Sequence, residues 1–123
     1  MYRVLLCTVL FFLFCTTDAE ESTSTKASPP RLSAAELLGM RAGRVLGAAK
    51  ICQTEPERLQ SIAKQTFAAV DEVGKSESDR ASADRHMRDA LNVGADDIKE
   101  GRITCEALQS ALNRLEHQLI QRR

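Results

Sequence analysis

From residue 32 onward, apolar residues recur every three or four positions, which is the spacing of amphipathic helices. The clearest stripe, at successive spacings of 3, 4, 3 and 4, consists of Cys105, Leu108, Leu112, Leu115 and Leu119. No segment alternates apolar and polar residues for long enough to predict a strand. The pattern therefore predicts an all-α protein of four helices.

Capping residues and glycines give the expected helix ends. Ser33 and Glu36 form a capping-box pattern at the start of a first helix, Ala34 to about Gln53. A second helix is expected to use Thr54 as its cap and Gly74 as a left-handed end. Ser76 and its acidic neighbours start the third helix, which ends at Gly101 and has a potential break at Gly94. Thr104 then caps the fourth.

Short connections between consecutive helices favour an up-down-up-down bundle. In that topology Cys52 ends the first helix and Cys105 begins the fourth, so both lie at the same end of the bundle. We expect a disulfide between them, which would stabilise the fold by about 4 kcal/mol through loop closure. A redox-active pair would favour Cys-x-x-Cys spacing, and zinc would need more nearby ligands.

The N-terminus has the pattern of a secretory signal peptide: a basic start, an apolar run and small residues before a cleavage point. We predict a signal peptide over 1–19, cleaved after Ala19, a disordered tether over 20–32 and a helical domain over 33–121. The apolar run over 4–14 is shorter than a membrane span, although an uncleaved anchor is the alternative. The expected location is periplasmic or secreted.

Composition narrows the classes of partner. Beyond residue 19, the one aromatic residue is Phe67, so stacking platforms for nucleic acid are absent from the sequence. The chain has 17 basic and 17 acidic residues, and no basic stripe or acidic tail is visible. We expect no nucleic-acid partner and no membrane span after cleavage; the expected partner is another protein or a second copy of the chain.

Three glycines recur at four-residue spacing in the first helix: Gly39, Gly43 and Gly47. Each weakens an isolated helix by about 1 kcal/mol relative to alanine. Small residues in such a row allow close approach of another helix. The favoured interpretation is an internal seam against the third or fourth helix, and the alternative is a homodimer or partner contact.

The sequence offers no pattern typical of catalysis or of cofactor binding. His86 and His117 stand outside metal-binding frames and are expected to be solvated. Residues 96–107 resemble a calcium loop in outline, but Ile98 and Ala107 occupy two positions that need oxygen ligands. We also expect a solvated acidic face on the third helix, made of Asp84, Asp89, Asp96, Asp97 and Glu100. No metal, cofactor or enzymatic activity is predicted.

The motif G-x-x-x-G-x-x-x-G-A-A-K-x-C, followed by G-R-x-T-C-E-A-L-x-x-A-L-x-R-L-E, resembles small two-cysteine helical proteins exported by proteobacteria. This resemblance implies a periplasmic or secreted location and transfers no active site. The architecture is also similar to that of periplasmic acid-stress chaperones. We expect a non-catalytic protein that acts through protein–protein contacts, with an acid-stress chaperone as the alternative.

Overall fold

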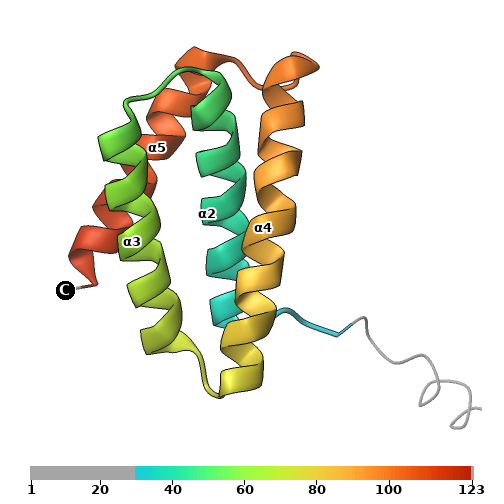
Figure 1. Cartoon of the computed structure of the whole chain (residues 1–123), viewed down its shortest axis with the longest axis vertical. Helices are drawn as coiled ribbons and strands as arrows, with labels where there is room; N and C mark the ends of the chain where they lie inside the picture. Colours follow the sequence, from blue (N-terminus) through green and yellow to red (C-terminus); the bar gives the residue numbers. More distant parts are fainter. Residues whose placement is uncertain (1–29, 123) are drawn as a thin grey trace, which may run out of the picture. The chain divides into compact units, whose positions relative to one another are not determined.

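The computed structural model describes residues 30–122, and these form the predicted all-α fold of four helices (Figure 1). The helices are α2 (Ala34–Ile51), α3 (Pro56–Val73), α4 (Glu77–Lys99) and α5 (Cys105–Gln121). The predicted signal peptide and most of the predicted tether lie outside the described residues. Within 30–122, no helix has the length and apolar character needed to cross a membrane.

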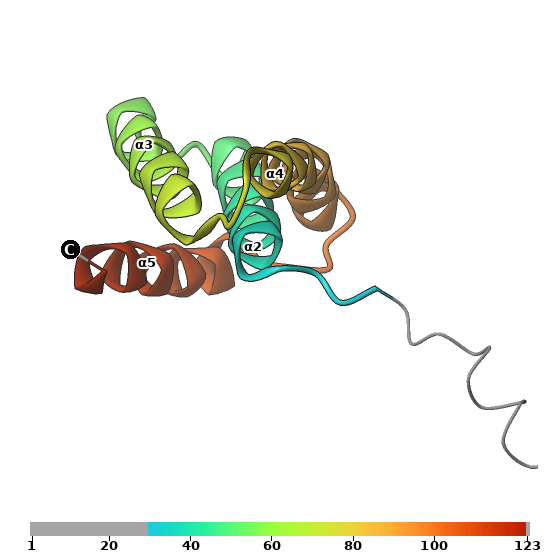
Figure 2. The same ribbon diagram turned by 90° about the horizontal axis from the view of Figure 1, so that it is seen from below.

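Successive helices alternate in direction, as the up-down-up-down prediction requires (Figure 1). This alternation brings the end of α2 next to the start of α5. The predicted disulfide joins them there, with an S–S distance of 2.06 Å and a Cα–Cα distance of 5.6 Å between Cys52 and Cys105. Seen along the bundle in Figure 2, α2 and α4 lie side by side, whereas α5 starts beside α2 and runs away from it, on the side of α3.

Most predicted helix ends are confirmed. The capping box of Ser33 and Glu36 is present, and the side chains of Ser76 and Thr104 cap α4 and α5. Gly101 ends α4 with a φ of 73°, a left-handed conformation that glycine adopts without a steric penalty. The first helix ends two residues earlier than expected, because Gln53 itself adopts a left-handed conformation with a φ of 58°.

Two predicted capping roles are wrong, although α3 does end at Gly74 as expected. Thr54 does not cap α3; the cap residue is Glu55, which makes no side-chain capping bond. The Thr54 backbone N–H instead donates to the Ala49 carbonyl, so this residue completes the end of α2. Gly74 is extended, with φ −66° and ψ 125°, rather than left-handed. Its carbonyl accepts a hydrogen bond from Arg80, whose side chain occupies the space where a Cβ would lie.

The three glycines of α2 lie against the backbone of α4. A Cβ added at Gly43 would overlap the Met87 carbonyl oxygen, and one at Gly47 would overlap that of Leu91. Gly39 faces Ala83 in the same way. Positions later in α2 contact positions later in α4: Gly39 faces Ala83, Gly43 faces Met87 and Gly47 faces Leu91. The two helices therefore run parallel. The glycine row is therefore an intramolecular contact surface in this fold.

The potential break at Gly94 is not present, and α4 is continuous from Glu77 to Lys99. Gly94 instead adds to the close packing, because a Cβ at this position would overlap the Arg44 carbonyl oxygen of α2. A small cluster of Ala35, Val70 and Ala83 joins α2, α3 and α4, and the main core lies mostly where α2, α3 and α5 meet. Its largest fully buried apolar side chains are Ile62, Leu108 and Leu112.

Candidate docking groove between α2 and α5

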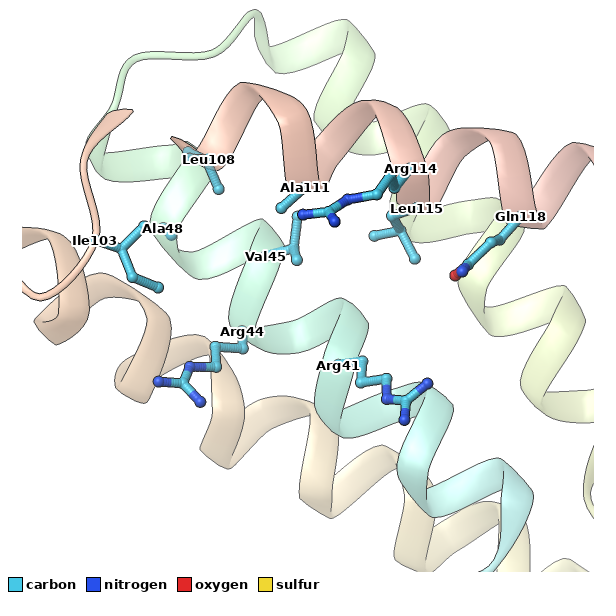
Figure 3. Close-up of a pocket in the computed structure, with 10 residues that line it drawn as sticks. All are labelled: Arg41, Arg44, Val45, Ala48, Ile103, Leu108, Ala111, Arg114, Leu115 and Gln118. Atoms are coloured by element: carbon cyan, nitrogen blue, oxygen red, sulfur yellow. The ribbon is translucent and has the colours of Figure 1, made fainter. Parts of the chain in front are cut away.

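An open groove runs between α2 and α5, because α5 leans away from α2 as it leaves the disulfide (Figures 2 and 3). It consists of two adjoining hollows of about 460 and about 510 Å³, which share the lining residues Arg41, Leu115 and Gln118. On α2 its lining extends from Ala34 to Ala48. At 1.5 Å per helical residue, this corresponds to roughly 20 Å.

The floor of the α2–α5 groove is apolar. Its aliphatic side chains come from both helices and from the loop before α5. They include Leu37, Leu38, Val45, Ala48, Ile103, Leu108, Ala111, Leu115 and Leu119. Several of these also belong to the hydrophobic core, so the groove exposes the edge of the core between two helices.

The rim of the groove is basic. It includes Arg41 and Arg44 from α2, and Arg114 and Arg122 from the α5 segment. In Figure 3, Arg114 extends from α5, whereas Arg41 and Arg44 extend from α2 on the side away from α5, with Arg44 directed toward α4. Among the described residues that line the groove, none is acidic. Four arginines therefore surround an apolar floor, in a chain whose formal charges cancel. Arg44 forms an ion pair with a carboxylate of α4, whereas the other three have no ion-pair partner within residues 30–122.

This local charge arises because several carboxylates are committed to contacts elsewhere between helices. Glu36 of α2 accepts a hydrogen bond from Ser82 of α4, and Asp79 of α4 accepts one from Ser33 at the start of α2. Glu116 of α5 pairs with Arg58 of α3 at 2.6 Å.

In each case the hydrogen bond to the carboxylate is the main cause of a pKa below the ordinary value: Ser82 for Glu36, Ser33 for Asp79 and Arg58 for Glu116. These three carboxylates hold helices together and do not offset the arginines of the groove.

The fourth such carboxylate, Asp97, is buried at the upper end of α4, with 1% of its surface exposed. The expectation of a solvated Asp97 is therefore wrong. Its two oxygens accept separate bonds, at 2.5 Å from Nε of Arg44 and at 2.7 Å from Nε of Arg102. These bonds, from Arg44 first and Arg102 second, lower the pKa of Asp97.

Asp97 also organises the turn into α5. Its backbone carbonyl accepts hydrogen bonds from the N–H groups of Arg102 and Ile103. One residue therefore connects α4, the following loop and an arginine of α2. A buried carboxylate with two guanidinium partners keeps its charge, since burial without such partners would favour the neutral form.

The other residues considered from the sequence lie outside the groove. Gly39, Gly43 and Gly47 face α4, and the disulfide closes one end of the bundle. The His86 ring lies 3.7 Å from a Glu36 oxygen, and the exposed His117 contacts Gln121. Within residues 30–122, no cluster of three or more potential ligand side chains could hold a metal ion.

The basic groove has no signature along the chain, because its four arginines come from two segments far apart in sequence. A signal for Asp97 was present: Ala83, Met87, Ala90 and Gly94 are buried at spacings of 4, 3 and 4, and Asp97 is the next position of that stripe.

Comparisons of the chain with protein-family models, with curated protein sequences and with solved structures gave no match.

Proposed function

We propose that this protein is an exported, non-catalytic binding module that acts through protein–protein contacts, and that the α2–α5 groove receives its partner. The observation that carries the proposal is an apolar floor with four arginines and no acidic residue among the described residues around it. The matching partner is a segment with an apolar face flanked by carboxylates.

A helical segment suits this groove better than an extended one. Both walls are helices, and the described residues contain no strand that could pair with an extended peptide. A lining of roughly 20 Å accommodates about fourteen residues of helix. Such a segment would place apolar residues at i, i+3, i+4 and i+7 on the floor, and acidic residues beside the arginines.

Charge argues against a symmetric dimer of this protein through the same groove. In a two-fold interface each copy contributes the same surface. Two copies meeting here would bring four arginines of one against four of the other, and juxtaposed like charges oppose association. A different protein with an acidic helix is therefore the proposed occupant.

Export supports this assignment. The N-terminal signal pattern and the Cys52–Cys105 disulfide both fit an oxidising compartment, periplasmic or extracellular. The resemblance to small two-cysteine proteins of proteobacteria implies the same location. A stable, disulfide-bonded helical surface suits a role in protein contacts outside the cytosol.

The test is binding of a synthetic fluorescent helix that carries leucine at i, i+3, i+4 and i+7 and glutamate on both flanks. Fluorescence anisotropy should detect binding to the disulfide-bonded protein. Arg41→Glu and Arg114→Glu should each weaken it at least about tenfold, because each reverses a charge on the rim. Arg85→Glu, which makes the same charge change on an exposed position of α4, should have little effect.

Two results would contradict the proposal. One is equal loss of binding in all three variants, which would indicate a general charge effect. The other is an absence of binding to the helix. Arg41-dependent binding to phosphatidylglycerol vesicles would then indicate a lipid surface instead.

A second candidate function, an acid-activated chaperone, is favoured by one observation: all four carboxylates with lowered pKa values join two helices. Their protonation in acid would remove these contacts and favour exposure of apolar surface. This role requires the protein to suppress aggregation of an unfolded client at about pH 2 but not at neutral pH. Absence of that activity in acid would exclude it.

A further inference from the structure

The buried Asp97 gives Arg44 a feature that the other groove arginines lack. Asp97 engages Arg44 through Nε, on the side of the guanidinium, at 2.5 Å. The two terminal nitrogens of Arg44 make no hydrogen bond with any residue of 30–122, and the side chain is 52% exposed. The guanidinium is therefore held on one edge while its other edge is open to a ligand.

Arg102, the second arginine bonded to Asp97, differs from Arg44 in its other hydrogen bonds. Arg102 also donates from Nε to Asp97, but one of its terminal nitrogens bonds to Glu100. Arg102 is not a lining residue of the groove, whereas Arg44 is. The two arginines thus share one buried carboxylate, and of the two only Arg44 lines the groove and has terminal nitrogens that make no hydrogen bond within residues 30–122.

The other rim arginines lack such a fixed partner. Within residues 30–122, neither Arg41 nor Arg114 takes part in a salt bridge. A long unpaired side chain loses rotamer entropy when it is ordered on binding. Arg44 has lost part of that freedom already, because its Nε is fixed to a residue with 1% exposure.

We propose that Arg44, positioned by Asp97, is the specificity-determining contact of the groove and reads one carboxylate of the partner helix at a fixed register. The inference rests on the proposed function. The two terminal nitrogens of a guanidinium match the two oxygens of a carboxylate, which makes the contact geometrically selective. Arg41 and Arg114 contribute attraction that tolerates several carboxylate positions.

The experiment uses the same fluorescent helix in versions that each retain a single glutamate, moved stepwise along the flanks, with glutamine elsewhere. For each position, affinity is compared with that of an all-glutamine helix. In the wild-type protein we expect one position to show a glutamate preference of about tenfold. Arg44→Gln should abolish this preference and leave binding of the all-glutamine helix nearly unchanged.

Arg102→Gln is the matched control, because it also removes one ion-pair partner of Asp97 but lies outside the groove. It should keep the glutamate preference at that position. Asp97→Asn should broaden the preference over several positions, since Arg44 would remain but lose its fixed orientation. Circular dichroism and thermal unfolding of each variant confirm that the comparison is made between folded proteins.

The outcomes separate the two proposals. If the wild type binds neither glutamate nor glutamine helices, the groove does not take this class of partner and the proposed function fails. If it binds them but Arg44→Gln and Arg102→Gln reduce the position-specific preference equally, Asp97 is only structural and this inference fails. An unchanged preference in Arg44→Gln would also overturn it.

Discussion

Gln53 and Gly101 occupy the same structural position at the ends of two different helices. Each follows the last helical turn with a positive φ, 58° for Gln53 and 73° for Gly101. In both, the next residue donates its N–H back five positions, from Thr54 to Ala49 and from Arg102 to Asp97. This is the Schellman arrangement, in which glycine avoids the steric cost of a side chain. Only one of the two ends has the favoured residue.

We predict that Gln53→Gly stabilises the protein by about 0.5–1 kcal/mol, because it removes the left-handed strain while losing only an exposed side chain. Gly101→Gln should destabilise it by a similar amount, as no neighbouring atom lies within 4 Å of an added Cβ and the cost is conformational. Urea unfolding of the disulfide-bonded proteins measures both. Destabilisation by Gln53→Gly would show that the Gln53 side chain makes a contact that outweighs the strain.

These positions also show what local sequence can predict. Ser33, Ser76, Thr104 and Gly101 were identified as helix ends because their chemistry is local and acts within a few residues. Gln53 carried no such signal, since glutamine is rarely left-handed. Thr54 does not cap α3 as its chemistry predicts, because it lies between two close helices and its backbone N–H completes the end of α2.

At the scale of the elements, the α2–α4 pair depends on close backbone contact. Glycine in the middle of a helix normally weakens it, and replacement by alanine normally helps by about 1 kcal/mol. Here the glycine row lies against carbonyl oxygens of α4, so the added methyl group has no space. The sign of the effect therefore distinguishes a packed row from an exposed one.

We predict that Gly47→Ala destabilises the protein by about 1–3 kcal/mol, because the methyl group would overlap the Leu91 carbonyl and force the two helices apart. The measurement is the free energy of unfolding in urea at neutral pH. Ser110→Ala, at an exposed position of α5, is the control and should change stability little. A gain of stability in Gly47→Ala would mean that α4 does not approach α2 in solution as described.

The sequence predicted the four helices and the position of the disulfide, since apolar spacing and cysteine placement are encoded along the chain. It left open which helix the glycine row faces. The groove could not be predicted, because it depends on the angle at which α5 crosses α2, which is set by packing of side chains from three helices. Arg114 of α5 lines the same groove as Arg41 of α2 only because of that crossing angle, so its role cannot be predicted from sequence position alone.

At the scale of the whole molecule, the four helices form two pairs, each held together by polar contacts between its helices, which we call a clasp. Polar contacts join α2 to α4 through Glu36, Asp79 and Asp97, and join α3 to α5 through Glu116. The pairs themselves are connected by the apolar core and the disulfide. The groove lies at the junction between them, between one helix of each pair, so its shape depends on both clasps.

This arrangement predicts loss of stability in acid. Each of these four carboxylates has a pKa lowered by its partners in the folded protein. Their contribution is fully present above the unfolded pKa values, about 4, and is lost as the pH falls through the lower folded values. The urea midpoint should therefore be nearly constant from pH 7 to about 5 and fall steeply below about 4.

Glu116→Gln, which removes one of these titrating groups, should be less stable at pH 7 and show a shallower decline in acid. An equally steep decline in that variant would mean that Glu116 contributes nothing to the acid response and that the α3–α5 clasp is not broken by protonation.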